Sequence, residues 1–459
     1  MPGSITEKIY YKMPVVFQNV LFSVYGWNLS RKRYNQWFHD NLTRLKKMEW
    51  WSAKQIEEYQ NKCFVDIVSH AYNTVPFYRK WYDEYGLDVG KIKSLSDLST
   101  LPILTKQMVK KNQDRFVSSI YKRNTLIEGL TSGTTGTPLT IYQTKKGLAF
   151  QWAIWWRHLM RFGINFKDRN FTFGARLPID QNQSKPPYWR NDFYNNRVYL
   201  STYHISEQTV NDIITFLNRS SFDFFTGYPS AMYILASLMD KQGLRLHSKP
   251  KLIVSGSDAL LPKYADLICR VFGSPITEQY GMAEFAGNMS KCEHGMFHED
   301  FECCYIEEIS RSSQPESGKL LMTGWGNGAM PFIRYETGDF AIPSQKACKC
   351  GRMSKCYTSI EGRLEDYVVT PDGRKIIGMN QVFEYAKNAK EMQIYQSSPN
   401  KIEFRIVAGK KFGDADKKAL KREFTRRAGV DMKMEFKFVK SLQRASSGKL
   451  KAVISDISN

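Results

Sequence analysis

Hydrophobic residues in the first hundred positions recur at the spacing of an α-helix. Ser52 and Gln55 form a capping box, the pair of polar residues that marks a helix start. Apolar residues then follow at helical spacing, at Ile56, Tyr59, Cys63, Ile67, Val68 and Ala71. The pattern ends at Val75-Pro76, because proline cannot continue a helix. Residues 1–100 are therefore predicted to form the helical N-terminal part of a large domain.

The segment before this helix, from Tyr10 to Trp51, mixes aromatic with basic residues. Its basic residues are Arg31, Lys32, Arg33, Arg44, Lys46 and Lys47. Such a mixture is found in helices that lie on acidic membranes. It is also compatible with a helical cap packed on the core, and the sequence leaves both interpretations open.

From about residue 125 onwards, short apolar strands alternate with helices. The strands are expected at 126–130, 171–175, 222–227, 251–257 and 274–281, and the helices at 148–162, 210–217 and 231–238. This alternation predicts an α/β sheet with helices on its faces. After Gly324 the sequence is typical of β-strands, and from Gly362 it forms a short separate segment. We therefore expect the α/β core of the large domain over 101–363 and a small α+β domain over 364–459.

Composition and charge narrow the class of protein. The chain has 459 residues, 42 % of them hydrophobic, which is globular composition, and a net charge of +21 that should attract anionic partners. No apolar run reaches the roughly 18 to 20 residues that span a bilayer, and no secretory signal is recognisable. We expect a soluble cytoplasmic protein, with peripheral contact at the inner membrane left open. No nucleic-acid-binding module is present, so nucleic acid is not an expected partner.

A turn rich in glycine and hydroxyl side chains follows the first predicted strand. It contains Thr131, Ser132, Gly133, Thr134, Thr135 and Gly136. Glycines let the backbone approach a ligand closely, and hydroxyl and amide groups suit phosphate oxygens. It is not a Walker loop, since no Gly-Lys-Ser/Thr follows. Taken alone, such a cluster is more often a polar turn.

Four further stretches change that judgement, because together with the turn they resemble the motifs of the adenylate-forming superfamily. They are Q-Y-G-M-A-E at 279–284, Y-E-T-G-D at 335–339, E-G-R-L-E-D at 361–366 and S-S-G-K at 446–449. All five occur in the family order. The resemblance implies the adenylate-forming fold: a large multi-sheet N-terminal domain and a small mobile C-terminal domain. It also implies ATP-dependent activation of a carboxylic acid.

The resemblance assigns roles to individual residues. The phosphate turn would hold the β and γ phosphates of ATP, and Glu284 would hold Mg²⁺. Asp339 would accept the ribose hydroxyls, with Arg363 nearby at the interdomain hinge, where Glu365 stands in place of the family's more usual Asp or Lys. Lys449 would bridge the attacking carboxylate and the α-phosphate. The adenine would be flanked by Tyr280 with its neighbours Gln279 and Gly281, and by Ser255, Gly256 and Ser257.

Within the superfamily the chain resembles the phenylacetate-CoA ligase-like branch, and within it the CapK-type proteins found with capsular and O-antigen polysaccharide biosynthesis. The similar segments lie at 11–14, 18–19, 25–26, 70–78, 203–206 and 331–335. The acceptor of the acyl group is then an amine or hydroxyl on a sugar or lipid-linked glycan, or coenzyme A. His204 could face that pocket or be a satisfied core histidine.

The cysteine pattern indicates a metal site. Cys292, His298, Cys348 and Cys350 make a Cys₃His set of the kind that binds structural zinc, and the branch is known for such a site. Competing ligands are His294, Cys303 and Cys304. For the last two, which lie in strand-like sequence, buried free thiols are the better interpretation. Four protein ligands would close the site, so the zinc would be structural.

Overall fold

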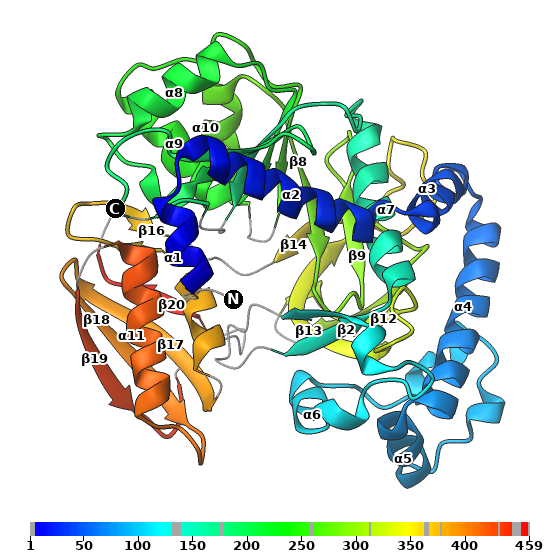
Figure 1. Ribbon diagram of the computed structural model, residues 1–459. Helices are drawn as coiled ribbons and strands as arrows, with labels where there is room; N and C mark the ends of the chain where they lie inside the picture. The colour runs from blue at the N-terminus through cyan, green and yellow to red at the C-terminus, as the bar shows by residue number, and fades with distance from the viewer. Residues whose placement is uncertain are drawn as a thin grey trace.

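The computed structural model describes most of the chain and places it in two parts (Figure 1). The described residues are 5–130, 139–174, 178–180, 182–256, 260–311, 314–361, 367–376, 379–386, 388–429, 432–442 and 451–457. The larger part contains the N-terminal helices and a twelve-stranded sheet. The smaller part, orange to red in Figure 1, contains a four-stranded sheet and lies beside the larger one.

The N-terminal region is helical, as its periodicity predicts. The helices are α1 (Ile5–Lys12), α2 (Val15–Arg33), α3 (Gln36–Met48), α4 (Ala53–Thr74), α5 (Pro76–Glu84) and α6 (Lys106–Lys111), with short 3₁₀ turns at Val89–Lys91, Leu95–Thr100, Gln113–Arg115 and Arg123–Thr125. Ser52 and Gln55 form the expected capping box at the start of α4. The helix ends at Thr74, and Pro76 opens α5. The apolar face of α4 packs in the main core through Phe64, Ile67 and Val68.

The alternation of strands and helices after residue 125 is confirmed. The strands here are β1 (Ile127–Leu130), β2 (Thr140–Gln143), β3 (Asn170–Gly174), β4 (Trp189–Asp192), β5 (Arg197–Ser201), β6 (Phe224–Gly227), β7 (Leu252–Ser255) and β8 (Ile276–Gly281). The helices are α7 (Lys145–Arg161), α8 (Val210–Arg219), α9 (Pro229–Lys241) and α10 (Pro262–Phe272), with a 3₁₀ turn at Thr202–His204. Strands β5, β3, β6, β7 and β8 are neighbours in that order and all parallel. Their carboxyl ends therefore meet along one edge, where α/β proteins usually bind ligands.

Antiparallel strands continue the same sheet beyond β8. They are β9 (Asn288–Lys291), β10 (Phe297–Glu299), β11 (Cys304–Arg311), β12 (Gln314–Gly324), β13 (Phe332–Pro343) and β14 (Cys356–Glu361). The full order is β11-β12-β13-β14-β10-β9-β8-β7-β6-β3-β5-β4. Since β8 pairs with β9 and β13 lies beyond it in the same sheet, the two motif regions 279–284 and 335–339 are held by one scaffold.

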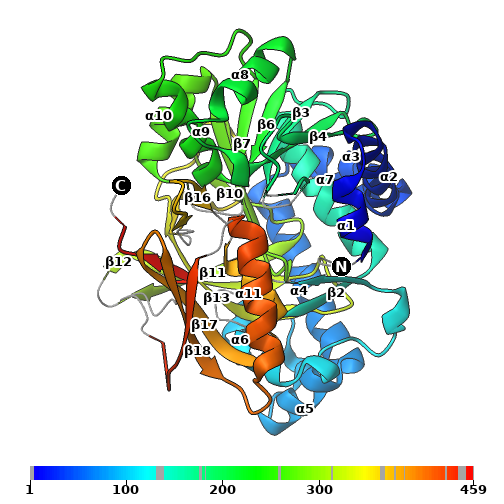
Figure 2. The ribbon, with the colours of Figure 1, turned by 60° about the vertical axis from the view of Figure 1, so that its left-hand side comes forward.

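The C-terminal part has its own core. Its elements are β15 (Val368–Val369), β16 (Lys375–Ile376), a 3₁₀ turn at Met379–Tyr385, β17 (Ala389–Ser398), β18 (Lys401–Ala408), α11 (Asp414–Ala428), β19 (Lys433–Phe438) and β20 (Val453–Ser455). Helix α11 lies against the sheet (Figure 2), where Phe424 meets Phe404. Tyr203 of the large part is buried in this core, and its hydroxyl accepts a bond of 2.9 Å from Arg427 Nη1. The predicted boundary near Arg363 falls on residues 362–366, outside the described residues, and stays a prediction.

The two longer helices of the N-terminal aromatic segment differ in the kind of residue they bury. Helix α3 is a packed cap, because it buries Phe38, Leu42, Leu45 and Met48. Helix α2 buries only polar residues and glycine. Among the described helices, none is both long and apolar enough to cross a bilayer.

Candidate functional site

The candidate nucleotide site is built at the carboxyl ends of β7 and β8. Ser255 is the last residue of β7 and Tyr280 is one residue from the end of β8. The Ser255 hydroxyl is fully buried and has no hydrogen-bond partner among the described residues. Such a group normally finds a partner, so it fits the edge of a site that a polar ligand completes. Gly256 follows it, and its N–H donates to the carbonyl of Gly227 at 3.2 Å.

Tyr280 and Asp339 meet although 59 residues separate them. The Tyr280 hydroxyl donates to Asp339 Oδ2 at 2.8 Å. Asp339 follows Gly338, which has a φ of 76°, and its N–H donates to Thr337 Oγ1 at 3.0 Å. This turn within β13 holds the carboxylate toward the end of β8. The structure therefore brings together the residues expected to flank the adenine and to accept the ribose hydroxyls.

Glu284 lies in the turn after β8, with its carboxylate buried. The Tyr335 hydroxyl donates to Glu284 Oε1 at 3.2 Å, and Lys106 Nζ of α6 lies 4.0 Å from the same oxygen. One turn further along α6, burial together with the charge of Lys106 lowers the pKa of Lys110 to about 8. One cationic group, Lys106, thus borders the carboxylate that is expected to hold Mg²⁺.

The backbone around Glu284 is unusual. Phe285 has a φ of 53°, in the left-handed region that residues with a side chain seldom adopt. Two glycines make room for it: a Cβ on Gly324 would lie 2.6 Å from the Phe285 carbonyl oxygen, and one on Gly326 would lie 2.1 Å from its ring. Strained backbone of this kind is common at functional sites. Here it lies directly after Glu284, the residue expected to hold Mg²⁺.

The remaining predicted nucleotide-site residues divide into two groups. Gln279 donates to Ser290 Oγ of β9 at 3.2 Å, and Gly281 closes β8. Outside the described residues lie Thr131, Ser132, Gly133, Thr134, Thr135, Gly136, Ser257, Arg363 and Lys449. Their expected roles therefore stay predictions.

Sequence reasoning missed two residues of this site. Lys106 lies on a short helix far from any motif. Tyr335 is the first residue of the five-residue stretch that ends in Asp339, and no role was assigned to it. A signal existed only for Tyr335, which belongs to the Y-E-T-G-D stretch. Lys106 is brought to Glu284 because Leu104 pairs with Tyr335 as an isolated β-bridge.

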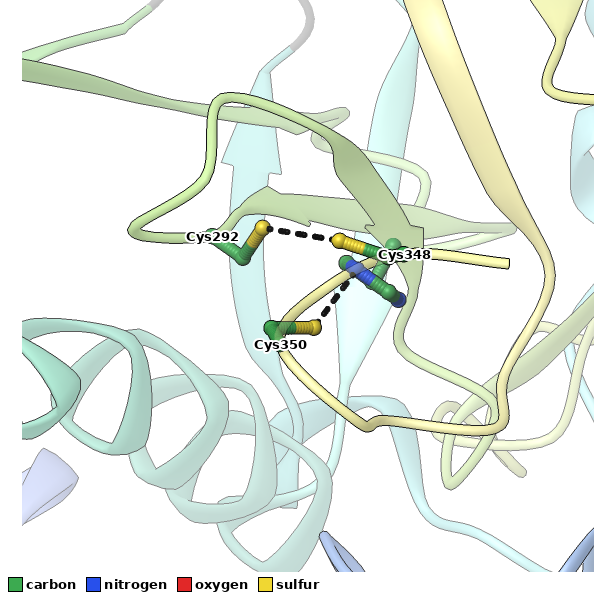
Figure 3. A group of neighbouring side chains, drawn as sticks. Cys292, Cys348 and Cys350 are labelled. Atoms are coloured by element: carbon green, nitrogen blue, oxygen red, sulfur yellow. Dashed lines mark hydrogen bonds between the residues drawn. The ribbon is translucent and has the colours of Figure 1, made fainter. Parts of the chain in front are cut away.

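The predicted zinc ligands come together. One potential ligand atom from each of Cys292, His298, Cys348 and Cys350 lies within 4.8 Å of all the others. The Cys292 and Cys348 sulfurs are 3.6 Å apart, and Cys350 Sγ is 3.3 Å from His298 Nε2 (Figure 3). Tetrahedral ligands at ordinary zinc distances are about 3.5 to 3.8 Å apart. The donor set and these two separations, which lie close to that range, are compatible with zinc.

Neighbouring groups orient these ligands. His298 Nδ1 faces Ser354 Oγ at 3.4 Å, which directs Nε2 toward the cysteines. Burial lowers the pKa of His298 to about 4, so the imidazole is neutral, as metal ligation requires. Arg352, two residues after Cys350, donates from Nε to Glu49 at 2.6 Å and from Nη1 to both oxygens of Glu293 at 3.0 Å. The metal loop is thereby tied to the end of α3.

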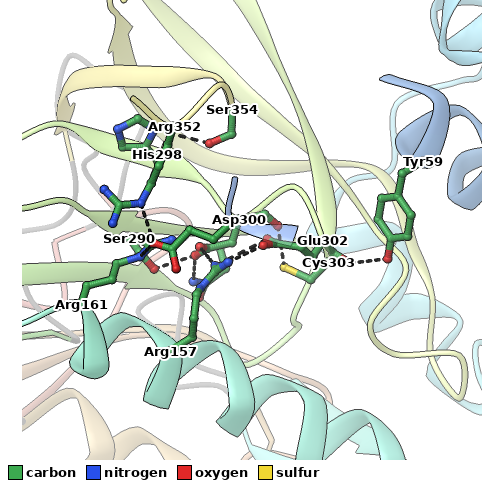
Figure 4. Close-up of polar contacts among 12 residues, drawn as sticks. Tyr59, Arg157, Arg161, Ser290, His298, Asp300, Glu302, Cys303, Arg352 and Ser354 are labelled. Atoms are coloured by element: carbon green, nitrogen blue, oxygen red, sulfur yellow. Dashed lines mark hydrogen bonds and ion pairs between the residues drawn. The ribbon is translucent and has the colours of Figure 1, made fainter. Parts of the chain in front are cut away.

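A buried ionic network continues from this loop into the core (Figure 4). Arg161 donates to Glu49 at 2.7 Å, and Arg157, one turn earlier on α7, donates to Asp300 and Glu302. Burial raises the pKa of Glu49, but Arg161, Arg157 and Arg352 outweigh it and hold that pKa below its ordinary value. Sequence periodicity gave no sign of this network, because its members lie in segments that are far apart in the chain.

The competing ligands are resolved. His294 is exposed and outside the cluster of four, and Cys303 and Cys304 are buried thiols whose Sγ atoms donate to the Asp300 carbonyl. His204 is a buried histidine: Nδ1 lies 2.7 Å from Ser201 Oγ, and the ring stacks on Tyr188. These contacts place His204 among buried residues, and a role in the acyl pocket stays a prediction.

Comparisons with known proteins show what the whole chain is similar to. Residues 368–456 match the family described as CapK C-terminal domain. Protein CapK of Staphylococcus aureus is 24 % identical over 98 % of this chain and 99 % of its own length. A phenylacetate-coenzyme A ligase of Thermus thermophilus is 22 % identical over 70 % of this chain and 74 % of its own. A crystal structure of 2-hydroxyisobutyryl-CoA ligase with 2-HIB-AMP and CoA matches with a TM-score of 0.59 at 18 % identity, covering 90 % and 92 % of the two chains. The adenylate-forming fold expected from the sequence is confirmed.

Proposed function

Because the chain is a CapK-related member of the adenylate-forming enzymes, we propose that it activates a carboxylic acid as an acyl-adenylate and passes the acyl group to an amine or hydroxyl on a sugar or lipid-linked glycan. The substrate carboxylate attacks the α-phosphorus of ATP, the bond to the β-phosphate breaks, and pyrophosphate leaves. The acceptor then attacks the acyl carbonyl, loses its proton, and releases AMP. By resemblance, the setting is capsule or O-antigen polysaccharide biosynthesis.

One observation carries this proposal. Two segments of the chain meet at the carboxyl edge of the parallel strands. Tyr280 pairs with Asp339, which is 59 residues away, and Glu284 pairs with Tyr335, which is 51 residues away. A structural role alone would not require a buried carboxylate, a tyrosine–aspartate pair and the Ser255 hydroxyl, which has no hydrogen-bond partner in the described part of the chain, all at one edge. Together they supply a hydroxyl for the base, an acceptor for the ribose and a ligand for a cation.

The chain's own residues would divide the work. Asp339, held by Tyr280, would position the ribose, and Glu284 would hold Mg²⁺, which would offset the charge of the phosphate oxygens. The turn 131–136, with Ser257 and Arg363, would complete the nucleotide contacts. Lys449 would stabilise the charge that develops as the carboxylate meets the α-phosphate.

Coenzyme A is the alternative acceptor. The relatives named phenylacetate-coenzyme A ligase favour it, whereas the match of the C-terminal domain to CapK favours the glycan acceptor. Both mechanisms share the first half-reaction, so only the second separates them.

Pyrophosphate exchange tests the shared step. The protein should incorporate labelled pyrophosphate into ATP with at least one member of a panel of aryl, fatty, amino and uronic acids. The same reactions with coenzyme A should yield no thioester if the acceptor is a glycan. Thioester formation would establish the alternative, and absence of ATP binding at millimolar concentration would refute both.

We propose zinc as the metal of the Cys₃His cluster. Replacing Cys350 with serine should weaken zinc binding more than about 100-fold, since loss of a direct ligand exceeds the 10- to 100-fold effect of losing an outer partner. Metal analysis of the purified variant measures this, and limited proteolysis should show cleavage between residues 343 and 356.

The matched control is Cys356→Ser. Cys356 lies six residues from Cys350 but outside the cluster of four, and its Sγ contacts the Lys346 carbonyl instead. This variant should keep its zinc and resist protease. Equal zinc in wild type and in the Cys350 variant would contradict the assignment.

A further inference from the structure

Helix α2 is inverted relative to an ordinary surface helix. Its buried residues are Gln18, Asn19, Gly26 and Ser30, which are polar or glycine. Its exposed residues include most of its large apolar side chains. A surface helix normally packs its apolar stripe on the core and turns its polar face to water. Both the burial of its polar face and the exposure of its apolar face therefore require an explanation.

The inner face is explained by the sheet edge on which it lies. Strand β4 ends the twelve-stranded sheet, so its outer edge has unpaired backbone groups. Asn19 Oδ1 accepts from the N–H of Asn191 at 2.9 Å, and Gln18 Oε1 accepts from Arg190 Nε at 2.6 Å. Ser23 Oγ accepts from the N–H of Phe193 at 3.0 Å. The polar face therefore covers the edge by hydrogen bonding.

Close approach at this contact requires Gly26. A Cβ at that position would lie 2.1 Å from the carboxylate of Asp192. The helix is thus fixed in rotation by its glycine and its polar residues, and it cannot turn its apolar side inward. The exposure of the other face is a consequence of specific contacts.

The outer face is a continuous apolar surface. Its members are Val16, Phe17, Val20, Leu21, Val24, Tyr25 and Trp27, each between 42 % and 70 % exposed. Phe193 and Tyr194, in the turn after β4, are 68 % and 57 % exposed, and the Phe193 N–H bonds to Ser23 of the helix, so this turn adjoins α2. The helix runs along the outside of the molecule in both views (Figures 1 and 2). Apolar surface gathered in this way marks an interaction site.

The charged residues of α2 itself all have one sign. Helix α2 contains no acidic residue, and its last turn is Arg31, Lys32 and Arg33. Lys12 precedes the helix and is exposed, as are Arg31 and Lys32. The Arg31 guanidinium lies 4.9 Å above the Trp27 ring, so an aromatic and a cation share one end of the surface. Cations at the border of an apolar helix face complement anionic headgroups.

We propose that α2 docks this protein flat on an anionic phospholipid bilayer, with Val16, Val20 and Val24 entering the acyl boundary and Lys12, Arg31 and Lys32 contacting headgroup phosphates. A second copy of the chain is the weaker candidate, because a two-fold contact through α2 would bring cationic ends together. The inference concerns binding at a surface remote from the nucleotide site. It holds or fails independently of the adenylating activity.

Vesicle flotation tests it with the full-length protein. The protein should float with phosphatidylcholine vesicles that contain about 30 % phosphatidylglycerol, and much less with phosphatidylcholine alone. The double variant Val20→Glu/Val24→Glu should lower the bound fraction at least about tenfold, because it places two charges where acyl chains would lie. Arg31→Gln/Lys32→Gln should weaken binding about 30-fold on the anionic vesicles, and high salt should do the same to the wild type.

The matched control carries the same two charges elsewhere. Ile120 and Phe438 are 60 % and 51 % exposed and lie outside α2. Ile120→Glu/Phe438→Glu should float like the wild type, and all variants should keep the wild-type melting temperature. Wild-type protein that stays with the lipid-free fraction, or a control that fails as badly as the α2 variant, would overturn the proposal. So would sedimentation showing a lipid-independent dimer that Val20→Glu/Val24→Glu dissociates.

Discussion

Replacing Arg157 with methionine should lower the free energy of unfolding of the large part by about 3 to 5 kcal/mol, the usual cost of removing one partner from a buried ion pair. Arg157 is 2 % exposed and is shared by Asp300 and Glu302, which are 1 % and 0 % exposed. Methionine fills a similar volume, so the loss comes from two carboxylates left in the core without a cation. Urea denaturation followed by tryptophan fluorescence measures it.

The pH dependence of the defect gives a second measurement. Burial raises the pKa of Glu302 even beside Arg157, and removing the arginine raises it further. A group whose pKa is higher in the folded state favours folding when it is protonated, and this contribution disappears as the pH rises through that pKa. The difference between the variant and the wild type should therefore shrink as the pH falls from 8 toward the range in which Glu302 binds its proton.

A surface arginine with similar geometry is the control. Arg270 donates to both carboxylate oxygens of Asp240, at 2.8 and 3.0 Å, but it is well exposed. Arg270→Met should change stability little, because water screens the pair. If the two variants lost equal stability, burial would not be the source of the effect. The ion pairs of Figure 4 would then contribute no more to stability than exposed ion pairs do.

The fold could be predicted from the sequence wherever burial follows a period. Helix α4 has both a capping box and an apolar stripe, and it forms where predicted. Helix α2 shows the limit of this reasoning. Its apolar residues mark a helix face correctly, but its rotation is set by Asn19 and Ser23 bonding to backbone N–H groups of residues 191 and 193. Periodicity indicates that a helix has an apolar face. It does not indicate what the opposite, polar face packs against.

The candidate site was predictable only where its residues stand in motifs. Tyr280, Glu284 and Asp339 were assigned from ordered motifs, and the structure brings their segments together. Lys106 could not be found, because a single lysine on a short helix has no pattern. Arg157 could not be found for a related reason: its two carboxylate partners lie more than 140 residues away.

Replacing Lys449 with alanine should lower adenylate formation by about 100- to 1000-fold or more, the usual effect of removing one charge-stabilising group from a transition state. Residues 443–450 lie outside the described residues, but the chain is anchored just beyond them. Gln393 Nε2 donates to the Lys451 carbonyl at 2.9 Å, and the Ile394 N–H donates to the Ala452 carbonyl at 2.9 Å. Residues 451 and 452, which follow Lys449 closely in the sequence, are thus held against β17 of the small part.

Since Lys449 is expected to act on the transition state, the loss should appear in kcat and leave the affinity for ATP nearly unchanged. Lys449→Arg should recover little, because a planar fork replaces a point charge. Lys440→Ala, an exposed lysine of the same domain, should retain full exchange activity. All three variants should melt like the wild type. A large fall in melting temperature for Lys449→Ala alone would mean that the lysine has a structural role. Full activity of the same variant would exclude it from the catalytic step, because the positive charge at the developing bond would then have to come from another residue.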